Sequence, residues 1–225
     1  METTLCVDAV EFRQALESAL LYTQDEDYSD HPLDHVCLHK IAFGSELKVV
    51  GLDGHGFYHQ VIKVYPQENG KHSALPVCQT GTFKGVEQLL IPAREAKNFV
   101  KQLPNKGNFT AEIIVKDNEI QPNEKFSVMI SCNAMHSFCI TFETPTNHYK
   151  ECPNYLQFIA IVEENKMLKI VQQGRRLPIK EYARLAKALP KEAVFSIYWG
   201  KGQEQPILVE LENTTIILMP TKWVD

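Results

Sequence analysis

Histidine recurs in this chain at spacings that could hold a metal ion or support acid–base chemistry. His31, His35 and His39 follow one another every four residues, and His55 and His59 repeat that interval. On a helix, this interval would gather the imidazole rings on one face, as metal-binding helices do. On a strand, residues four apart share a face but lie about 13 Å apart, which is too far for one zinc ion.

The segment that carries the first three histidines favours a strand. Pro32 and the β-rich run VCLHKIAF (residues 36–43) are typical of extended backbone. Asp53 and His55 could form a catalytic dyad, but neither a nucleophile motif such as GxSxG nor a phosphate-binding glycine loop accompanies them. We therefore predict no catalytic residue, no metal and no cofactor. A His-rich metal-binding enzyme remains the alternative from another functional class.

The stretch GLDGHGFYH (residues 51–59) lies between two apolar, strand-like runs. Asp-Gly in this position is a strong hairpin signal, because glycine readily adopts the positive φ that tight turns require. The sequence therefore predicts a β-hairpin that turns at Asp53 and Gly54. Such a turn can also form one wall of a binding site.

The composition is that of a soluble globular protein, with 44% hydrophobic residues, 23% charged residues and a formal net charge of -5. No apolar run reaches about 18 residues and no leader sequence is visible, so we expect a cytoplasmic protein without a membrane partner. The six cysteines form no CxxC pair and indicate reduced, mostly buried thiols. The negative charge argues against a generally basic nucleic-acid binder but permits a local basic face.

An internal repeat is the strongest signal in the chain. IPAREAKNFVKQLP (residues 91–104) and LPIKEYARLAKALP (residues 177–190) align without gaps. Each predicts a strand end, a proline in the first helical turn, about three turns of helix and a terminating proline. Three strand-like runs follow each helix, and the N-terminal segment has the same order. The chain therefore contains three helix-plus-three-strand units, with residues 65–86 as a connecting excursion.

The two repeated helices have an apolar face and a basic face. The apolar positions are Ala96, Phe99, Val100 and Leu103 in one helix and Leu185, Ala186 and Leu189 in the other. The basic positions are Arg94, Lys97 and Lys101 in one helix and Lys180, Arg184, Lys187 and Lys191 in the other. The N-terminal helix instead presents Arg13, Gln14 and Glu17. Basic faces of this kind fit either a solvated surface or an anionic partner.

Units of this kind, with a sheet outside and basic helices inside, resemble the bacterial DNA sliding clamp, the beta subunit of DNA polymerase III. GLDGHG (residues 51–56) is similar to that family's ATDGHR run. Four further stretches resemble family segments in the same order: DHPLDHVCLH, IPAREAKNFVKQL, ECPNYLQFI and TTIILMPTKW. The resemblance covers most of residues 5–158 and 175–223. The family has six units per chain, and its arginines after Asp-Gly-His and Met-Pro-x are replaced by Gly56 and Lys222.

The resemblance implies an α+β DNA-clamp fold, built from repeated βαβββ units with antiparallel sheets outside and helices on the inner face. It implies two domains: residues 1–158, which resemble the family's middle domain, and residues 159–225, a half-domain of one unit. The implied function is that of a non-enzymatic processivity factor, a homo-oligomeric ring around double-stranded DNA. The alternative is a truncated clamp relative that binds replication proteins without encircling DNA. A trimeric ring would need a fourth unit within residues 144–175.

The resemblance also implies two binding surfaces. An apolar pocket would dock a clamp-binding peptide of DNA polymerase or another replication protein, with methionine as an adaptable wall. Its residues would be Leu52, Gly54, His55, Gly56, Phe57, Pro153, Gln157, Phe158, Ile217, Met219, Pro220 and Thr221. From pattern alone, Ile217 and Met219 would be ordinary core residues. The DNA phosphates would be contacted by Arg94, Lys97, Lys101, Lys180, Arg184, Lys187 and Lys191.

Overall fold

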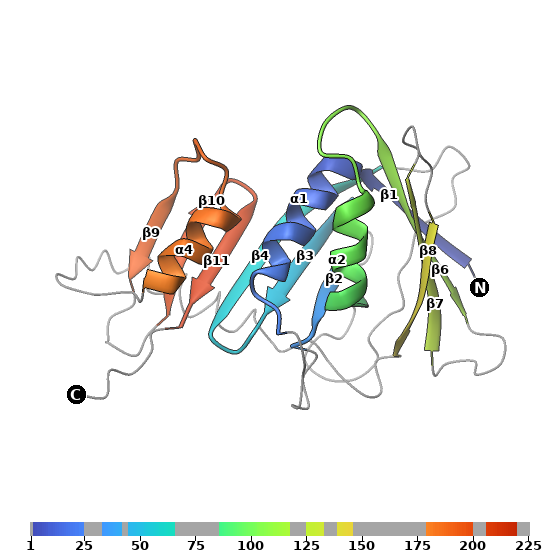
Figure 1. The fold of residues 1–225 in the computed structure, drawn as a ribbon, viewed down its shortest axis with the longest axis horizontal. Coiled ribbons are helices and arrows are strands. Elements are labelled where there is room, and N and C mark those ends of the chain that lie inside the picture. The colour runs from blue at the N-terminus through green and yellow to red at the C-terminus, as the bar shows by residue number, and fades with distance from the viewer. Residues whose placement is uncertain are drawn as a thin grey trace.

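The computed structural model contains three helices and eleven strands within the residues that it describes, and the helices lie side by side against the strands (Figure 1). The described residues are 2–24, 33–41, 45–65, 86–117, 125–132, 139–145, 179–199 and 206–219. The predicted domain boundary at residues 158 and 159 lies outside these ranges.

The three predicted helix-plus-three-strand units are confirmed within the described residues. The first unit consists of β1 (Glu2–Asp8), α1 (Ala9–Leu20), β2 (His35–Ile41), β3 (Glu46–Leu52) and β4 (Gly56–Tyr65). The second consists of β5 (Val86–Pro92), α2 (Ala93–Gln102), β6 (Thr110–Asp117), β7 (Lys125–Cys132) and β8 (Cys139–Pro145). The C-terminal unit consists of α4 (Ile179–Ala188), β9 (Ser196–Trp199), β10 (Ile207–Leu211) and β11 (Thr214–Leu218).

All eleven strands belong to one branched antiparallel sheet. Its main path runs β5-β2-β3-β4-β1-β6-β7-β8, and its two end strands, β5 and β8, come into contact. The branch lies at β4, which pairs with β3 along one edge. On the other edge, residues 56–60 pair with β11, and Val64 and Tyr65 pair with β1. β10 and β9 then extend the branch from β11.

Local signals fix where the first two helices begin and end. The Asp8 carboxylate caps α1 by accepting hydrogen bonds from the amides of Val10 (2.9 Å) and Glu11 (2.8 Å). Pro92 is the N-cap residue of α2. It therefore lies directly before the first helical turn, whereas the sequence predicted it within that turn. The extended backbone of Leu103 (ψ 141°) ends α2, and Pro104 follows.

One hydrophobic core lies between the helices and the sheet. Phe12 and Leu16 of α1, Phe99 of α2 and Leu185 of α4 join strand residues such as Ile62 in a single cluster. α1 lies between α2 and α4 on the same side of the sheet (Figure 1). The predicted apolar face of the last helix needs one correction, since Ala186 is exposed, whereas Ala188 is buried beside Leu189.

A second, smaller cluster lies on the face of the sheet away from the helices. We call this face the outer face and the cluster the outer cluster. Because side chains alternate along a strand, residues next to core positions point to this opposite face. The cluster contains Cys37, Val50, Phe57, Leu90, Leu208 and Ile217, with Leu52 and Tyr198 packed against it. Strands of all three units contribute to it, so the sheet has apolar contacts across the branch on both faces.

The histidine segment forms a strand, β2, as predicted. His39 on β2 and His59 on β4 are 1% and 8% exposed and share the outer face with Cys37. Burial, together with the smaller effect of the nearby Lys48 ammonium, lowers the pKa of each from 6.5 to about 3. Both imidazoles are therefore neutral in the folded protein at neutral pH.

This burial predicts loss of stability in mild acid. Well above pH 6.5 the two histidines are neutral whether the chain is folded or unfolded, so they confer no pH dependence there. As the pH falls from 6.5 towards 3, only the unfolded chain gains protons, and each histidine lowers the free energy of unfolding by about 1.4 kcal/mol per pH unit. Urea unfolding of His39→Leu between pH 7 and pH 5 should show a shallower decline than wild type. His55→Gln, a change at an exposed histidine, should keep the wild-type slope, and equal slopes in all three proteins would contradict the prediction.

Candidate functional site

The predicted hairpin connects β3 to β4 and turns at Asp53 and Gly54. Gly54 has a φ of 84°, the left-handed conformation that glycine adopts without steric cost. One carboxylate oxygen of Asp53, Oδ1, accepts hydrogen bonds from the amides of His55 (2.9 Å) and Gly56 (2.8 Å). The aspartate thus closes the turn with its own side chain.

Gly56 lies against the ring of Tyr22, which follows α1. A Cβ atom at Gly56 would come within 2.8 Å of Tyr22 Cδ1, closer than real Cβ atoms approach other atoms. No side chain fits at this position unless the ring moves, and Tyr22 is fully buried and stacked on Tyr58, with ring centroids 6.0 Å apart. A glycine at position 56 is therefore demanded by packing inside this chain.

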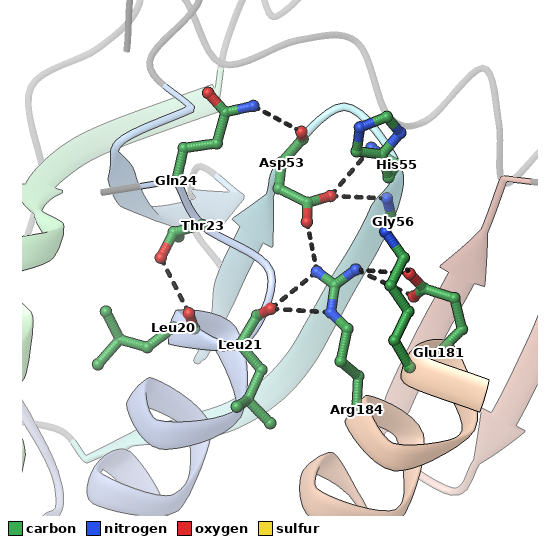
Figure 2. A network of polar contacts seen from close by, with 10 residues as sticks. Leu20, Leu21, Thr23, Gln24, Asp53, His55, Gly56, Glu181 and Arg184 are labelled. Carbon is green, nitrogen blue, oxygen red and sulfur yellow. Dashed lines mark hydrogen bonds and ion pairs between the residues drawn. The ribbon is translucent and has the colours of Figure 1, made fainter. Parts of the chain in front are cut away.

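The second carboxylate oxygen of Asp53 forms an ion pair with Arg184 of α4 (Figure 2). The arginine Nε and Nη2 atoms also donate to the carbonyl oxygen of Leu21, at 3.1 and 2.7 Å. Its Nη1 atom donates to both carboxylate oxygens of Glu181, at 3.3 and 3.0 Å. All three nitrogen atoms of the guanidinium thus donate to an acceptor. We call Asp53, Glu181, Arg184 and the Leu21 carbonyl the arginine network.

The arginine network is largely shielded from water. The side chains of Asp53, Arg184 and Glu181 are 14%, 18% and 5% exposed. The guanidinium also lies over the Tyr22 ring, 4.4 Å from its centroid, in a cation–π contact. The Leu21 carbonyl belongs to the C-cap of α1, where the helix dipole favours a cation. Burial raises the pKa of Tyr22, and the neighbouring Arg184 charge partly opposes this effect.

The structure separates Arg184 from the other predicted DNA-facing residues. The sequence places it in the basic stripe of its helix, but it turns towards α1, and its donors are already bonded. The other members of the set are exposed: Arg94, Lys97, Lys101, Lys180, Lys187 and Lys191. Arg13 of α1 pairs with Glu17 and bonds the Leu103 carbonyl. Of the described helices, α2 and α4 therefore present the basic faces.

Because β4 pairs with β11, the predicted pocket residues of the hairpin lie next to those near the C-terminus. Phe57 lies opposite Ile217 in the pairing register, and both are buried in the outer cluster beside Leu52. The Met219 amide donates to the carbonyl oxygen of His55 (2.9 Å). Gly54 and His55 are exposed at the turn, whereas Gly56 faces inward. The remaining predicted pocket residues lie outside the described ranges: Pro153, Gln157, Phe158, Pro220 and Thr221.

Sequence reasoning missed the arginine network. Glu95 and Asn98 occupy the positions in the second unit that match Glu181 and Arg184, and Asn98 donates to Glu95 at 3.2 Å. Both repeated helices therefore carry a polar pair at positions i and i+3. In α4 the second member of the pair is Arg184, which also bonds groups outside its own helix. The polar pair was visible when the two repeats were aligned. The other partners of Arg184, which are Leu21 and Asp53, could not be identified in this way because they are far away in the chain.

Two negative findings concern the described residues. They include no group of three or more His, Cys, Asp or Glu side chains placed to hold a metal ion. They also include no helix that is long and apolar enough to cross a membrane.

The fold matches those of bacterial DNA sliding clamps. The C. crescentus beta sliding clamp superimposes with a TM-score of 0.63 and 12% identity, over 99% of this chain and 67% of the clamp. The Helicobacter pylori beta clamp, solved bound to a DNA ligase peptide, gives 0.59 and 12%, over 98% and 66%. The sliding clamp of Pseudomonas aeruginosa bound to griselimycin gives 0.57 and 12%, over 100% and 67%.

The chain therefore has the α+β fold of DNA sliding clamps and spans about two thirds of the length of these clamps. No family model matches the sequence, and no curated protein does. With so little sequence identity, these matches establish the fold, while the roles of the individual residues rest on the geometry described above.

The arginine network predicts a large stability effect from one residue. Arg184→Met would remove the guanidinium from the largely buried carboxylates of Asp53 and Glu181, which should lower the free energy of unfolding by about 3–5 kcal/mol. Arg13→Met is the matched control, because Arg13 also bonds a helix C-terminal carbonyl but pairs with the exposed Glu17. It should cost only about 1 kcal/mol. Urea unfolding measures both changes, and similar losses would contradict the assignment.

Proposed function

We propose that this protein is a sliding-clamp-like processivity factor, which assembles with copies of itself into a ring around double-stranded DNA. It docks a short peptide of DNA polymerase or another replication protein at the β4–β11 junction. The observation that carries the proposal is the set of exposed cations on α2 and α4, on the helix side of a clamp-type sheet.

The basic faces suit DNA that must slide. Five exposed cations lie on these two helices (Arg94, Lys97, Lys101, Lys180 and Lys187), and the net charge of the chain is -5, so they concentrate positive charge on one side of an acidic protein. Lysine and arginine contacts to phosphates are independent of base sequence and permit movement along the duplex. The described residues of the helices include no device that would read bases, and a sliding ring needs none.

The position of β9 at the end of the described sheet branch supports assembly with a second copy. In the second unit, β6 pairs with β7 and also with β1. The corresponding strand of the C-terminal unit, β9, pairs only with β10 among the described strands. Four of the five exposed large apolar side chains in the described residues belong to this unit: Tyr182, Val194, Phe195 and Ile197. Exposed apolar groups beside a strand at the end of a sheet favour association with another chain.

The peptide pocket is supported by the meeting of two walls. Phe57 and Ile217 belong to the outer cluster, and the partly buried Leu52 packs against it. Met219 is also partly buried and is bonded to the hairpin through its amide. Apolar groups beside a few polar backbone groups suit a short peptide with leucine or phenylalanine anchors.

A second candidate function follows from the length of the chain. Because it spans about two thirds of the clamps it matches, it could bind replication proteins as a clamp relative that forms no ring. The two functions differ in solution mass and in DNA binding, which the next two predictions address.

Charge reversal on the helices should weaken DNA binding. The variant Lys97→Glu/Lys101→Glu/Lys187→Glu should lose most of its salt-dependent association with duplex DNA, and the slope of log affinity against log salt should fall by about one for each lysine. Lys63→Glu is the control, because Lys63 is exposed on the opposite face of the sheet. Fluorescence anisotropy at several salt concentrations measures both. Equal effects of Lys63→Glu and a single Lys97→Glu change would remove the helices from the DNA interface.

Self-assembly should depend on the exposed apolar groups of the C-terminal unit. Light scattering over a range of concentrations should show a stable trimer or tetramer for the wild-type chain. Tyr182→Lys should shift this mass towards the monomer, because it puts a charge among the exposed apolar groups of that unit. Tyr65→Lys is the matched control, since both tyrosines are 47% exposed. A wild-type chain that is monomeric at high micromolar concentration would exclude the ring and favour the second candidate.

A further inference from the structure

We infer that Arg184 is a positioning residue for the peptide-binding site. Arg184 extends from α4 and holds the Asp53 turn in position. Through that turn it also positions the lip of the site, which is formed by His55, Gly56 and Met219, for a docked peptide. This inference rests on the proposed peptide-docking function but concerns a residue outside the predicted pocket. It also gives Arg184 a role other than the DNA contact that its sequence position suggests.

The turn offers few other anchors. Asp53 uses Oδ1 within the turn, for the amides of His55 and Gly56, and its amide donates to the Gly56 carbonyl at 3.3 Å. Its contacts to other elements are the carbonyl bond from Gln24 (2.8 Å) and the ion pair with Arg184. Among the described residues, Arg184 is the one that connects this turn to α4, and it does so with a charge-assisted bond, which is stronger than a neutral one.

The lip moves with the turn because backbone bonds join them. The His55 carbonyl accepts the Met219 amide at the end of β11, so a shift of the turn displaces the methionine wall. Gly56 begins the pairing of β4 with β11 opposite Leu218, and its close approach to Tyr22 leaves little freedom. The guanidinium covers that same ring. Arg184 therefore restrains the lip directly through Asp53 and indirectly through Tyr22.

Arg13 provides a natural comparison within the chain. It donates to the Leu103 carbonyl at the end of α2 (2.7 Å), much as Arg184 donates to the Leu21 carbonyl at the end of α1. Its carboxylate partner, Glu17, belongs to its own helix. Both arginines thus join two neighbouring helices, but among the two only Arg184 also reaches a turn at the predicted pocket.

The test measures the lip by hydrogen exchange and the site by peptide binding. In Arg184→Gln, the amides of His55, Gly56 and Met219 should exchange at least tenfold faster than in wild type, while amides of the β6–β7 pair keep their relative protection. The affinity for a synthetic Gln-Leu-Ser-Leu-Phe peptide should fall at least tenfold. Arg184→Lys keeps the charge but has fewer donors. Its exchange rates and its peptide affinity should therefore lie between those of wild type and Arg184→Gln. Arg13→Gln should leave both readouts within twofold of wild type.

The outcomes separate the inference from the function on which it rests. Equal acceleration of the lip and of β6–β7 in Arg184→Gln would show a merely global loss of stability and overturn the inference, as would unchanged lip exchange. If Arg184→Gln fails to fold, Arg184→Lys carries the same comparison. A wild-type protein that binds no peptide, or binds it equally well after Met219→Ala, would overturn the pocket. The exchange data would still decide whether Arg184 positions the turn.

Discussion

The position of the C-terminal unit depends on the pairing of one strand with three others. β4 is ten residues long, and β1 pairs with only Val64 and Tyr65 at its far end. The remaining amide and carbonyl groups on that edge need partners, and β11 supplies them over residues 56–60. The same register sets Ile216 beside Tyr58 on the helix side and Ile217 beside Phe57 on the outer side. One strand pairing thus creates the joint core and the outer cluster together.

Helix packing reinforces this junction through polar contacts at helix ends. The last carbonyl groups of a helix have no partner within the helix, and arginine is well suited to bond them. Arg184 serves the end of α1, while Arg13 serves the end of α2. Ser18 of α1 adds a bond to the carbonyl of Ala188 at 3.1 Å. These contacts join the three helices in the order α4, α1, α2, so the helix face behaves as one surface.

The hairpin and the repeat could be predicted because their causes are local. Asp53 and Gly54 specify a turn through φ and an aspartate side chain that bonds the following amides. The helices follow from 3.6-residue periodicity and proline stops. The burial of Ala188 in place of Ala186, and the turning of Arg184 towards α1, could not be read from periodicity. Both depend on where α1 lies beside α4, which is a long-range contact.

The sequence by itself determined the three units, the basic faces of two helices and the turn that becomes a lip, since each depends on neighbours a few residues apart. The tertiary structure decided which cations remain exposed and which one is bonded inside the protein. It also decided that position 56 must be glycine, because the Tyr22 ring fills the space that a side chain would need. The physical reason is common to these cases, because an ion pair or a packed ring depends on atoms that strand pairing brings together from distant segments. Tyr22 and Gly56 are more than 30 residues apart in the chain, and Asp53 and Arg184 are more than 130 apart.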